Sequence, residues 1–218
     1  MLKIAVLMPG EVGQPGEHLA DARALETAGA HALWLDEGAH DPWMLAAALA
    51  TVTSRVRLGV SLTPLADPAT LARHLRTLDE LSRGRAELRG PAASVGAAIA
   101  LTRVVERCRV FGVGDEGGWA ALDGRADGLV LSGREPDEDR GRLDSARQLV
   151  GCRHPSTPLE CWVQIKLPDS HAGWRRTLAA YEAAGADGLL VPLDPRLVDL
   201  LRRGDEEDDR SDLTLAQG

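Results

Sequence analysis

The sequence predicts an α/β fold of the compact (β/α)8 TIM-barrel type, and two observations predict it. Eight short apolar segments of strand length alternate with eight segments that have helical periodicity. Three junctions also repeat one design, in which a helix ends at a glycine and an apolar strand follows: Gly29, Gly124 and Gly185. A chain of 218 residues is long enough for one such domain and lies near the lower size limit of a barrel.

The stretch 55–90 shows the repeating unit most clearly. Its first part alternates apolar residues with Gly59, Ser61 and Thr63, the period of two that is typical of a strand. Asp67 and the proline after it then provide an N-cap and a first helical turn, and leucines follow at helical spacing. A second strand completes a βαβ unit, so its two strands run parallel. We expect Gly59, Ser61 and Thr63 to face the barrel interior.

The same reasoning places every other element along the chain. The predicted strands are Lys3–Leu7, Ala32–Asp36, Arg57–Leu62, Arg85–Arg89, Arg109–Val113, Gly128–Ser132, Glu160–Ile165 and Gly188–Val191. The predicted helices are Glu17–Ala28, Pro42–Thr53, Ala69–Ser82, Ala92–Arg107, Glu116–Leu122, Glu138–Val150, Gly173–Ala184 and Pro195–Arg203. Residues 1–204 therefore form a single barrel domain, and residues 205–218 form an acidic tail.

Composition narrows the class of protein. Hydrophobic residues make up 44% and charged residues 27%, as in an ordinary globular domain, whereas aromatic residues make up only 3%. The core is therefore expected to rest on Ala, Leu and Val. The formal charge is −8, and the tail carries six acids against Arg210, so we expect the tail to add little to the core. No basic stripe indicates nucleic acid, and no long apolar run indicates a membrane.

The cysteines and the N-terminus indicate the compartment. Cys108, Cys152 and Cys161 form no CxxC pair and no metal-binding spacing, so no metal is predicted and they are read as reduced thiols. The first residues form a strand that runs into a Pro-Gly turn, unlike a signal peptide. A cytoplasmic protein is expected.

Several segments together resemble a known family. LGVSLTPLADPATLARHLRTLDELSRGRAEL is similar to the block from strand three to strand four of the bacterial luciferase-like monooxygenases and coenzyme F-420-dependent oxidoreductases. Upstream, ARALETAGAHALWLDE and DPWMLAAALATVTSRVRLG resemble that family's first two helices and second strand. Downstream, GRADGLVLS and WRRTLAAYEAAGADGLLVPLD resemble its sixth and eighth strands. Members usually carry a long insertion after strand four, and this chain lacks it.

The resemblance implies a barrel that binds FMN or the deazaflavin coenzyme F-420 and oxidises or reduces a small molecule. The family supports the flavin ring on a bulge with a non-prolyl cis peptide, which by position falls at Ser61–Leu62. Small inward residues at Gly59, Ser61 and Thr63 would leave room for a flat ligand, although they would equally well only pack the barrel. The predicted cofactor-binding residues are Gly59, Ser61, Leu62, Thr63, Gly114, Arg134 and Lys166.

The remaining site residues follow from the rule that barrel sites form at the C-terminal ends of the strands. His40 is the one histidine expected at the barrel mouth, where an imidazole is a natural proton donor, so it is the candidate catalytic residue. The family's usual histidine position holds Gly38, so His40 either replaces that histidine or only flanks a helix start. Gly114 lies in a glycine-rich loop that could offer N–H groups to a phosphate or form an ordinary turn. Arg134 and Lys166, at neighbouring strand ends, could supply positive charge.

Two functions therefore stay open. The first is a luciferase-like oxidoreductase of the monooxygenase type that acts on a small-molecule substrate. The second is a non-catalytic luciferase-like barrel that serves as a flavin-binding or dimer-partner protein, which Gly38 and the missing insertion favour. The resemblance also implies a homodimer through the second and third helices. The helix PWMLAAALATV is apolar almost all round, which agrees with a partner on its outer face.

Overall fold

The computed structural model describes most of the chain. The described residues are 2–11, 13–62, 67–91, 94, 108–122, 124, 126–152, 154 and 157–202. Three predictions lie outside them: the position of Thr63, the helix expected over 92–107 apart from Ser94, and the acidic tail.

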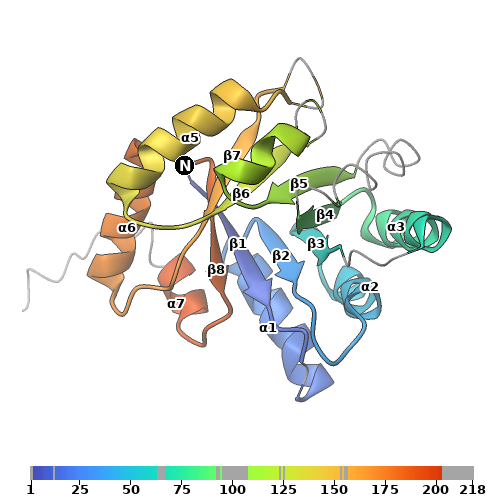
Figure 1. Ribbon diagram of the computed structural model, residues 1–218. Coiled ribbons are helices and arrows are strands. Elements are labelled where there is room, and N and C mark those ends of the chain that lie inside the picture. Colours follow the sequence, from blue (N-terminus) through green and yellow to red (C-terminus); the bar gives the residue numbers. More distant parts are fainter. Residues whose placement is uncertain are drawn as a thin grey trace, which may run out of the picture.

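Eight parallel strands close into a barrel in sequence order, so the predicted fold is confirmed (Figure 1). The strand order is simple because each strand hydrogen-bonds to the next, and the last pairs with the first. The strands are β1 (Lys3–Met8), β2 (Ala32–Leu35), β3 (Arg57–Ser61), β4 (Ala86–Pro91), β5 (Arg109–Val113), β6 (Gly128–Ser132), β7 (Glu160–Gln164) and β8 (Gly188–Pro192).

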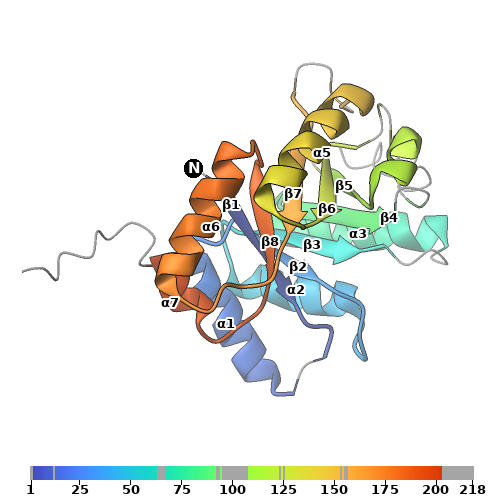
Figure 2. The same cartoon turned by 60° about the vertical axis from the view of Figure 1, so that its left-hand side comes forward.

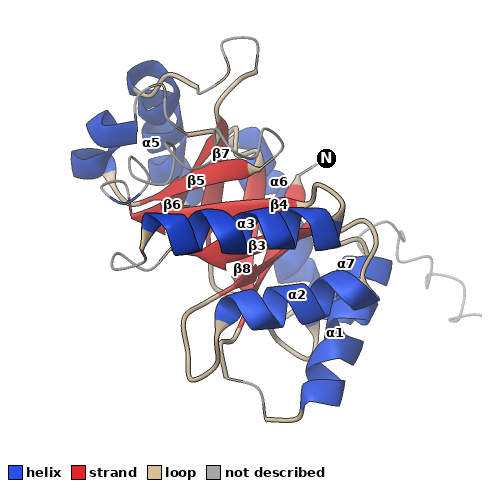
Figure 3. Ribbon diagram, turned by 90° about the vertical axis from the view of Figure 1, so that its right-hand side faces the viewer, coloured by secondary structure: helices blue, strands red, loops and turns tan. Residues whose placement is uncertain are grey.

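Helices cover the outside of the barrel. They are α1 (Pro15–Thr27), α2 (Pro42–Val52), α3 (Pro68–Ser82), the 3-10 helix η1 (Glu116–Leu122), α5 (Pro136–Leu149), α6 (His171–Ala183) and α7 (Leu197–Arg202). The bounds of α2 and η1 agree closely with the sequence, whereas α5 begins two residues earlier than predicted because Pro136 occupies its first turn. Figure 2 shows α5 beside α6, and Figure 3 shows α2 beside α3 on another side of the barrel.

The predicted helix–strand junctions have the expected backbone. Gly29, Gly124 and Gly185 have φ values of 99°, 63° and 89°, a left-handed conformation that a side chain rarely adopts. Asp67 caps α3 as predicted, since its carboxylate accepts the Thr70 N–H at 2.9 Å. The end of α3 differs from the glycine-closed helix ends, because a non-glycine residue, Arg83, takes the left-handed cap position at φ 58°.

The two faces of β3 point as the sequence predicts. Leu58, Val60 and the following Leu62 are buried in the cluster that joins the strands to the surrounding helices. Gly59 and Ser61 face the interior, where they meet side chains of β2 and β4. The prediction about strand orientation is thus confirmed for both of the residues that the structure describes.

Three aromatic rings fill the middle of the barrel, and each lies over a glycine of the next strand. Trp34 of β2 pairs with Gly59, Phe111 of β5 with Gly128, and Trp162 of β7 with Gly188. A Cβ at Gly188 would lie 2.5 Å from the Trp162 ring, and one at Gly128 would lie 2.6 Å from Phe111. The rings also contact one another, with centroids 5.1 Å apart for Trp34–Phe111 and 5.5 Å for Trp34–Trp162. The expectation that the core rests on Ala, Leu and Val therefore holds for the cluster between the strands and the helices, whereas aromatic rings fill the barrel interior.

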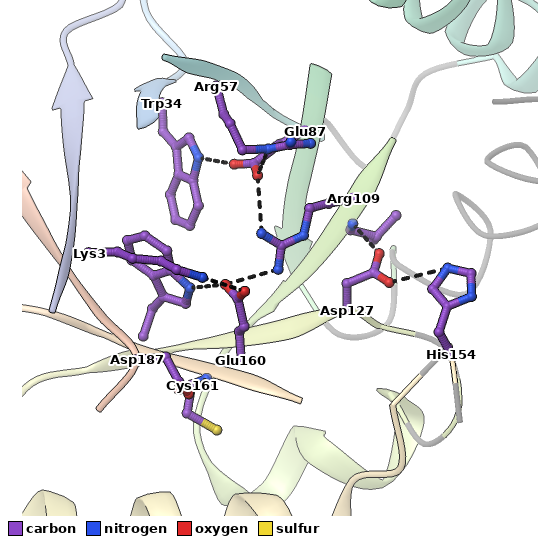
Figure 4. Close-up of polar contacts among 12 residues, drawn as sticks. Lys3, Trp34, Arg57, Glu87, Arg109, Asp127, His154, Glu160, Cys161 and Asp187 are labelled. Carbon is purple, nitrogen blue, oxygen red and sulfur yellow. Dashed lines mark hydrogen bonds and ion pairs between the residues drawn. The ribbon is translucent and has the colours of Figure 1, made fainter. Parts of the chain in front are cut away.

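Beneath the rings, charged side chains close the N-terminal end of the barrel (Figure 4). Glu160 accepts from Lys3 Nζ at 2.6 Å and pairs with Arg109 at 2.9 Å. Glu87 pairs with Arg57 and accepts the indole N–H of Trp34 at 2.8 Å. We call these five charged residues the basal network. Because its carboxylates also hold tryptophan N–H groups, the network fixes the rings above it.

The outer faces of α2 and α3 include exposed apolar side chains. Met44 is 71% exposed and Leu81 is 48% exposed, while Trp43 packs on His74 with ring centroids 5.5 Å apart. The homodimer through these helices stays a prediction.

Replacement of Gly188 tests the seating of the rings. Gly188→Ala should lower the free energy of unfolding by about 1–3 kcal/mol, because the added methyl overlaps Trp162 in a filled interior. Urea unfolding measures the change. Gly141→Ala is the control: position 141 lies within α5 with open space around it, so alanine there should stabilise by about 0.5–1 kcal/mol. Equal effects at the two positions would contradict the seating.

Acid should weaken the basal network through Glu160. Burial alone would raise the pKa of Glu160, but Lys3 and Arg109 outweigh it and lower the pKa to about 2. A carboxyl whose pKa is lowered by folding stabilises the folded state above its unfolded pKa of about 4.5, and that contribution is lost as pH falls toward 2. We expect up to about 3 kcal/mol of acid sensitivity from this group. Urea unfolding at pH 7, 4 and 3 should therefore show a shallower loss for Glu160→Gln, and parallel pH profiles would refute the assignment.

Candidate functional site

A cavity of about 850 Å³ lies at the C-terminal ends of β6, β7 and β8. One wall is the segment that joins β6 to α5, and another is the face of α6 that runs from Gly173 to Tyr181. This is the end of the barrel at which ligands bind in this fold. The polar lining residues include Ser132, Arg134, Gln164, Lys166, Arg176 and Tyr181.

Three cationic side chains line this cavity, and none of them forms an ion pair with a described carboxylate. Arg134 follows β6, Lys166 follows β7, and Arg176 lies on α6. Within the described part of the chain, none of the three takes part in an ion pair, and Glu135 is the acid among the lining residues. A concave wall with excess positive charge attracts anions, and guanidinium groups suit phosphate or carboxylate geometry. The structure thus brings together Arg134 and Lys166, the two cations selected from the sequence. Arg176 was missed, because helical periodicity does not reveal which exposed residue borders a cavity.

Two other arginines near the same end of the barrel are paired with carboxylates. Arg142 binds Asp139 and Asp115, each at 2.5 Å, and Arg196 binds Asp194 at 2.9 Å. These contacts neutralise the arginines locally. They therefore differ from Arg134, Lys166 and Arg176, which line the cavity without an ion pair to a described residue.

A buried polar cluster supports the wall that carries Arg134. Asp139 is fully buried and accepts the Arg134 backbone N–H at 2.9 Å. The Tyr181 hydroxyl lies 3.0 Å from the Arg134 carbonyl oxygen and 3.2 Å from Asp139 Oδ2. Burial, with the Asp139 charge beside it, raises the pKa of Tyr181 far above its ordinary value, so the hydroxyl keeps its proton.

The opposite side of the barrel mouth holds an ion pair that the sequence analysis did not select. Arg89 of β4 is buried and pairs with Asp36 at 2.8 Å, and its Nε donates to Ser61 Oγ at 2.9 Å. Its guanidinium carbon also lies 5.8 Å from the centroid of the Trp34 ring. Burial lowers the pKa of Arg89, and Asp36 partly offsets that effect. The alternation along β4, which puts Glu87 and Arg89 on one face, was the available signal.

The pocket predicted along β3 is smaller than the sequence suggested. Trp34 fills the space beside Gly59, so any ligand room lies above this position, near Ser61. Leu62 is 5% exposed on the helix-facing side, and its N–H donates to the Arg89 carbonyl oxygen. The described residues contain no cis peptide bond, so the cis bond that the resemblance implied at Ser61–Leu62 is not present. The cofactor roles of Gly59, Ser61 and Leu62 stay predictions.

The structure explains why glycine occupies position 38. A Cβ there would overlap the backbone of Gly10, because the loops after β1 and β2 pass against each other. A histidine cannot occupy position 38 with this backbone. His40 is exposed, and its ring nitrogen Nδ1 lies 3.3 Å from the Gly10 carbonyl oxygen. Asp41 beside it caps α2 by accepting from the Trp43 and Met44 N–H groups. The proton-donor role of His40 stays a prediction.

The glycine-rich loop after β5 has its own contacts. Gly114 adopts φ 148°, its N–H donates to the Val130 carbonyl oxygen, and its carbonyl oxygen accepts the Trp119 indole N–H. Asp115 next to it binds Arg142. This loop therefore meets the wall of the cavity through Arg142, and Gly114 does not line the cavity.

The described residues hold no cluster of three potential metal ligands, and none of their helices has the length and apolar character needed to span a bilayer.

Comparison with known proteins places the fold in context. The coenzyme F420-dependent tetrahydromethanopterin reductase from Methanopyrus kandleri superposes with a TM-score of 0.74 at 10% identity, over 94% of this chain and 98% of that one. An F420-dependent secondary alcohol dehydrogenase, solved with an F420-acetone adduct, gives a TM-score of 0.69 at 12% identity, over 92% and 96%. The tryptophan synthase alpha subunit from Legionella pneumophila gives 0.63 at 12% identity, over 88% and 80%.

At these identities the superpositions show the barrel fold alone. A search of curated proteins found no match. Residues 2–91, however, match the family model described as luciferase-like monooxygenase. The match covers β1 to β4, and the family resemblance predicted from the sequence is confirmed over that part of the chain.

Proposed function

We propose that this protein is an oxidoreductase of the luciferase-like type that binds coenzyme F420 or FMN at the C-terminal mouth of the barrel and acts on a small molecule. The observation that carries the proposal is the cavity with three cations, none paired with a described residue, at the ligand-binding end of a barrel whose first half is luciferase-like. Both cofactors carry phosphate, so a cavity lined by cations suits either one.

The residues present fit the two ends of such a cofactor. Arg134 and Lys166 would hold the phosphate, with Arg176 as a third cation on the facing helix. Ser61 would border the ring, over the closed layer that Trp34 forms, and Arg89 would place positive charge near it. When bound, the cofactor supplies the redox chemistry. The chain binds and orients it, and the filled interior below keeps water away from that side.

The cationic cavity suits the phosphate of either cofactor, so the structural neighbours give the order of titration. The two luciferase-like neighbours are described as F420-dependent. F420 is thus the first ligand to titrate, and FMN is the second.

Binding of F420 should depend on Lys166. We expect a saturable change in F420 absorbance with the parent protein, and about a tenfold higher Kd for Lys166→Ala, because a charge-assisted contact contributes about 1.5–3 kcal/mol. Arg196→Ala is the matched control: this arginine is paired with Asp194 and does not line the cavity, so its Kd should stay within twofold.

No spectral change with either F420 or FMN at high micromolar protein would refute cofactor binding. The non-catalytic dimer-partner function would then be the better account. One observation already favours that alternative: the backbone contact between Gly10 and Gly38 leaves no space for a side chain at the position where the family commonly has histidine.

Ser61→Trp tests where the ring lies. The indole would occupy the space above Trp34, so F420 or FMN binding should fall at least tenfold by titration, while the protein still folds. Ser61→Ala is the control, since it removes the hydrogen bond to Arg89 but adds no volume. Parent-like affinity in Ser61→Trp would show that the ring binds elsewhere.

A further inference from the structure

The turn that carries Arg134 is fixed by contacts from three elements. From β7, the Gln164 carbonyl oxygen accepts the Gly133 N–H at 2.8 Å. From α5, Asp139 accepts the Arg134 N–H at 2.9 Å. From α6, the Tyr181 hydroxyl lies within hydrogen-bond distance of the Arg134 carbonyl oxygen and of Asp139. Both backbone polar groups of Arg134 therefore have a side-chain partner from another part of the fold.

Position 133 adds a steric limit to this turn. A Cβ at Gly133 would lie 2.5 Å from the Gln164 carbonyl oxygen, so only glycine allows the turn to approach β7 this closely. The turn is thus pressed against the strand end that leads to Lys166. This close approach brings the two cations to the same cavity.

The supporting cluster requires a carboxylate to be taken out of water. Asp139 is 0% exposed, and a buried carboxylate is costly unless it is paired and hydrogen-bonded. Arg142 neutralises it at 2.5 Å and also donates to the Ser132 carbonyl oxygen at the end of β6. Asp139 lies within α5 and is not its N-cap, so its buried ion pair and its tyrosine partner from a second helix call for another role.

We propose that Tyr181 and Asp139 are positioning residues of an anion site, and that they hold the Gly133–Arg134 turn so that the Arg134 guanidinium faces a phosphoryl group in the cavity. This inference deepens the proposed function and rests on it for the identity of the natural ligand. The site itself takes an anion with two adjacent negatively charged oxygens, because a planar guanidinium binds such a group through two parallel hydrogen bonds.

Arg142 connects the same cluster to the loop after β5. Its second nitrogen binds Asp115, which follows Gly114. The loop on β5 and the turn on β6 are therefore held by one arginine. Tyr181 differs from Arg142 in that it also lines the cavity, so its effect must be separated from direct contact with the ligand.

A double-mutant cycle with pyrophosphate separates the two roles. Calorimetric titration would compare the parent, Tyr181→Phe, Arg134→Ala and the double variant. Tyr181→Phe keeps the ring and removes only the hydroxyl, and loss of one net hydrogen bond predicts about three- to tenfold weaker binding. If Tyr181 acts through Arg134, the same change should alter binding by less than twofold once Arg134 is already alanine.

Thr27→Val is the matched control. It also removes a hydroxyl that donates to a backbone carbonyl, that of Arg23, but it lies on α1 far along the chain from the cavity residues. Its pyrophosphate affinity should equal that of the parent. If Tyr181→Phe does not fold, the same cycle is run with Asp139→Asn, which keeps the shape of the side chain and removes its charge.

The outcomes divide clearly. An effect of Tyr181→Phe that persists in the Arg134→Ala background would overturn the positioning role, since Tyr181 would then act directly on the anion. Absence of pyrophosphate binding by the parent would overturn the anion site. Titration with F420 and FMN, run in parallel with Lys166→Ala, tests the proposed function independently. If a cofactor binds but the effects of Tyr181→Phe and Arg134→Ala on pyrophosphate binding are additive, only the positioning role is refuted. A non-additive cycle without cofactor binding keeps the anion site and removes the oxidoreductase.

Discussion

The seating of three aromatic rings over three glycines is the constraint on which the rest of the structure depends. Each ring needs the space that a side chain on the next strand would take, so Trp34, Phe111 and Trp162 fix the register of the strand pairs they join. The basal network closes the barrel below them, and two of its carboxylates hold the indole N–H groups. Among the described residues, the interior is therefore filled at these two levels, and the space within the barrel that is left for a ligand lies above the rings.

The repeated Ala-Asp-Gly segment of the sequence acquires a physical meaning from this packing. In both copies the aspartate accepts an N–H near the start of the preceding strand: Asp127 from Val110, and Asp187 from Cys161, each at 2.8 Å (Figure 4). The glycine that follows leaves room for the aromatic ring of that same strand. In this motif the aspartate thus anchors the start of the preceding strand, and the glycine next to it makes room for an aromatic ring of that strand. The earlier copy, with His31 and Ala32 in these positions, lacks both features.

Local patterns predicted the fold because strand alternation and junction glycines are properties of neighbouring residues. The inward direction of Gly59 and Ser61 follows from the period of two. The ring over Gly59 could not be predicted, because it requires knowing that β2 and β3 pair Trp34 with that glycine. For the same reason Arg89 and Asp36, 53 residues apart, give no sequence signal of their ion pair. Arg134 and Lys166 were predicted together because the barrel rule brings neighbouring strand ends to one place.

The half of the barrel mouth that matches the family model and the half that does not also differ in charge. On the half that matches the family model, Arg89 is compensated by Asp36 and lies near the Trp34 ring, so this cation is neutralised above a filled interior. The half made of β6 to β8 carries the uncompensated cations and the cavity, and it lies outside the matched segment. The proposed ring site and the proposed anion site thus fall on different halves. The family match includes the proposed ring site, whereas the cations of the proposed anion site lie outside the matched residues.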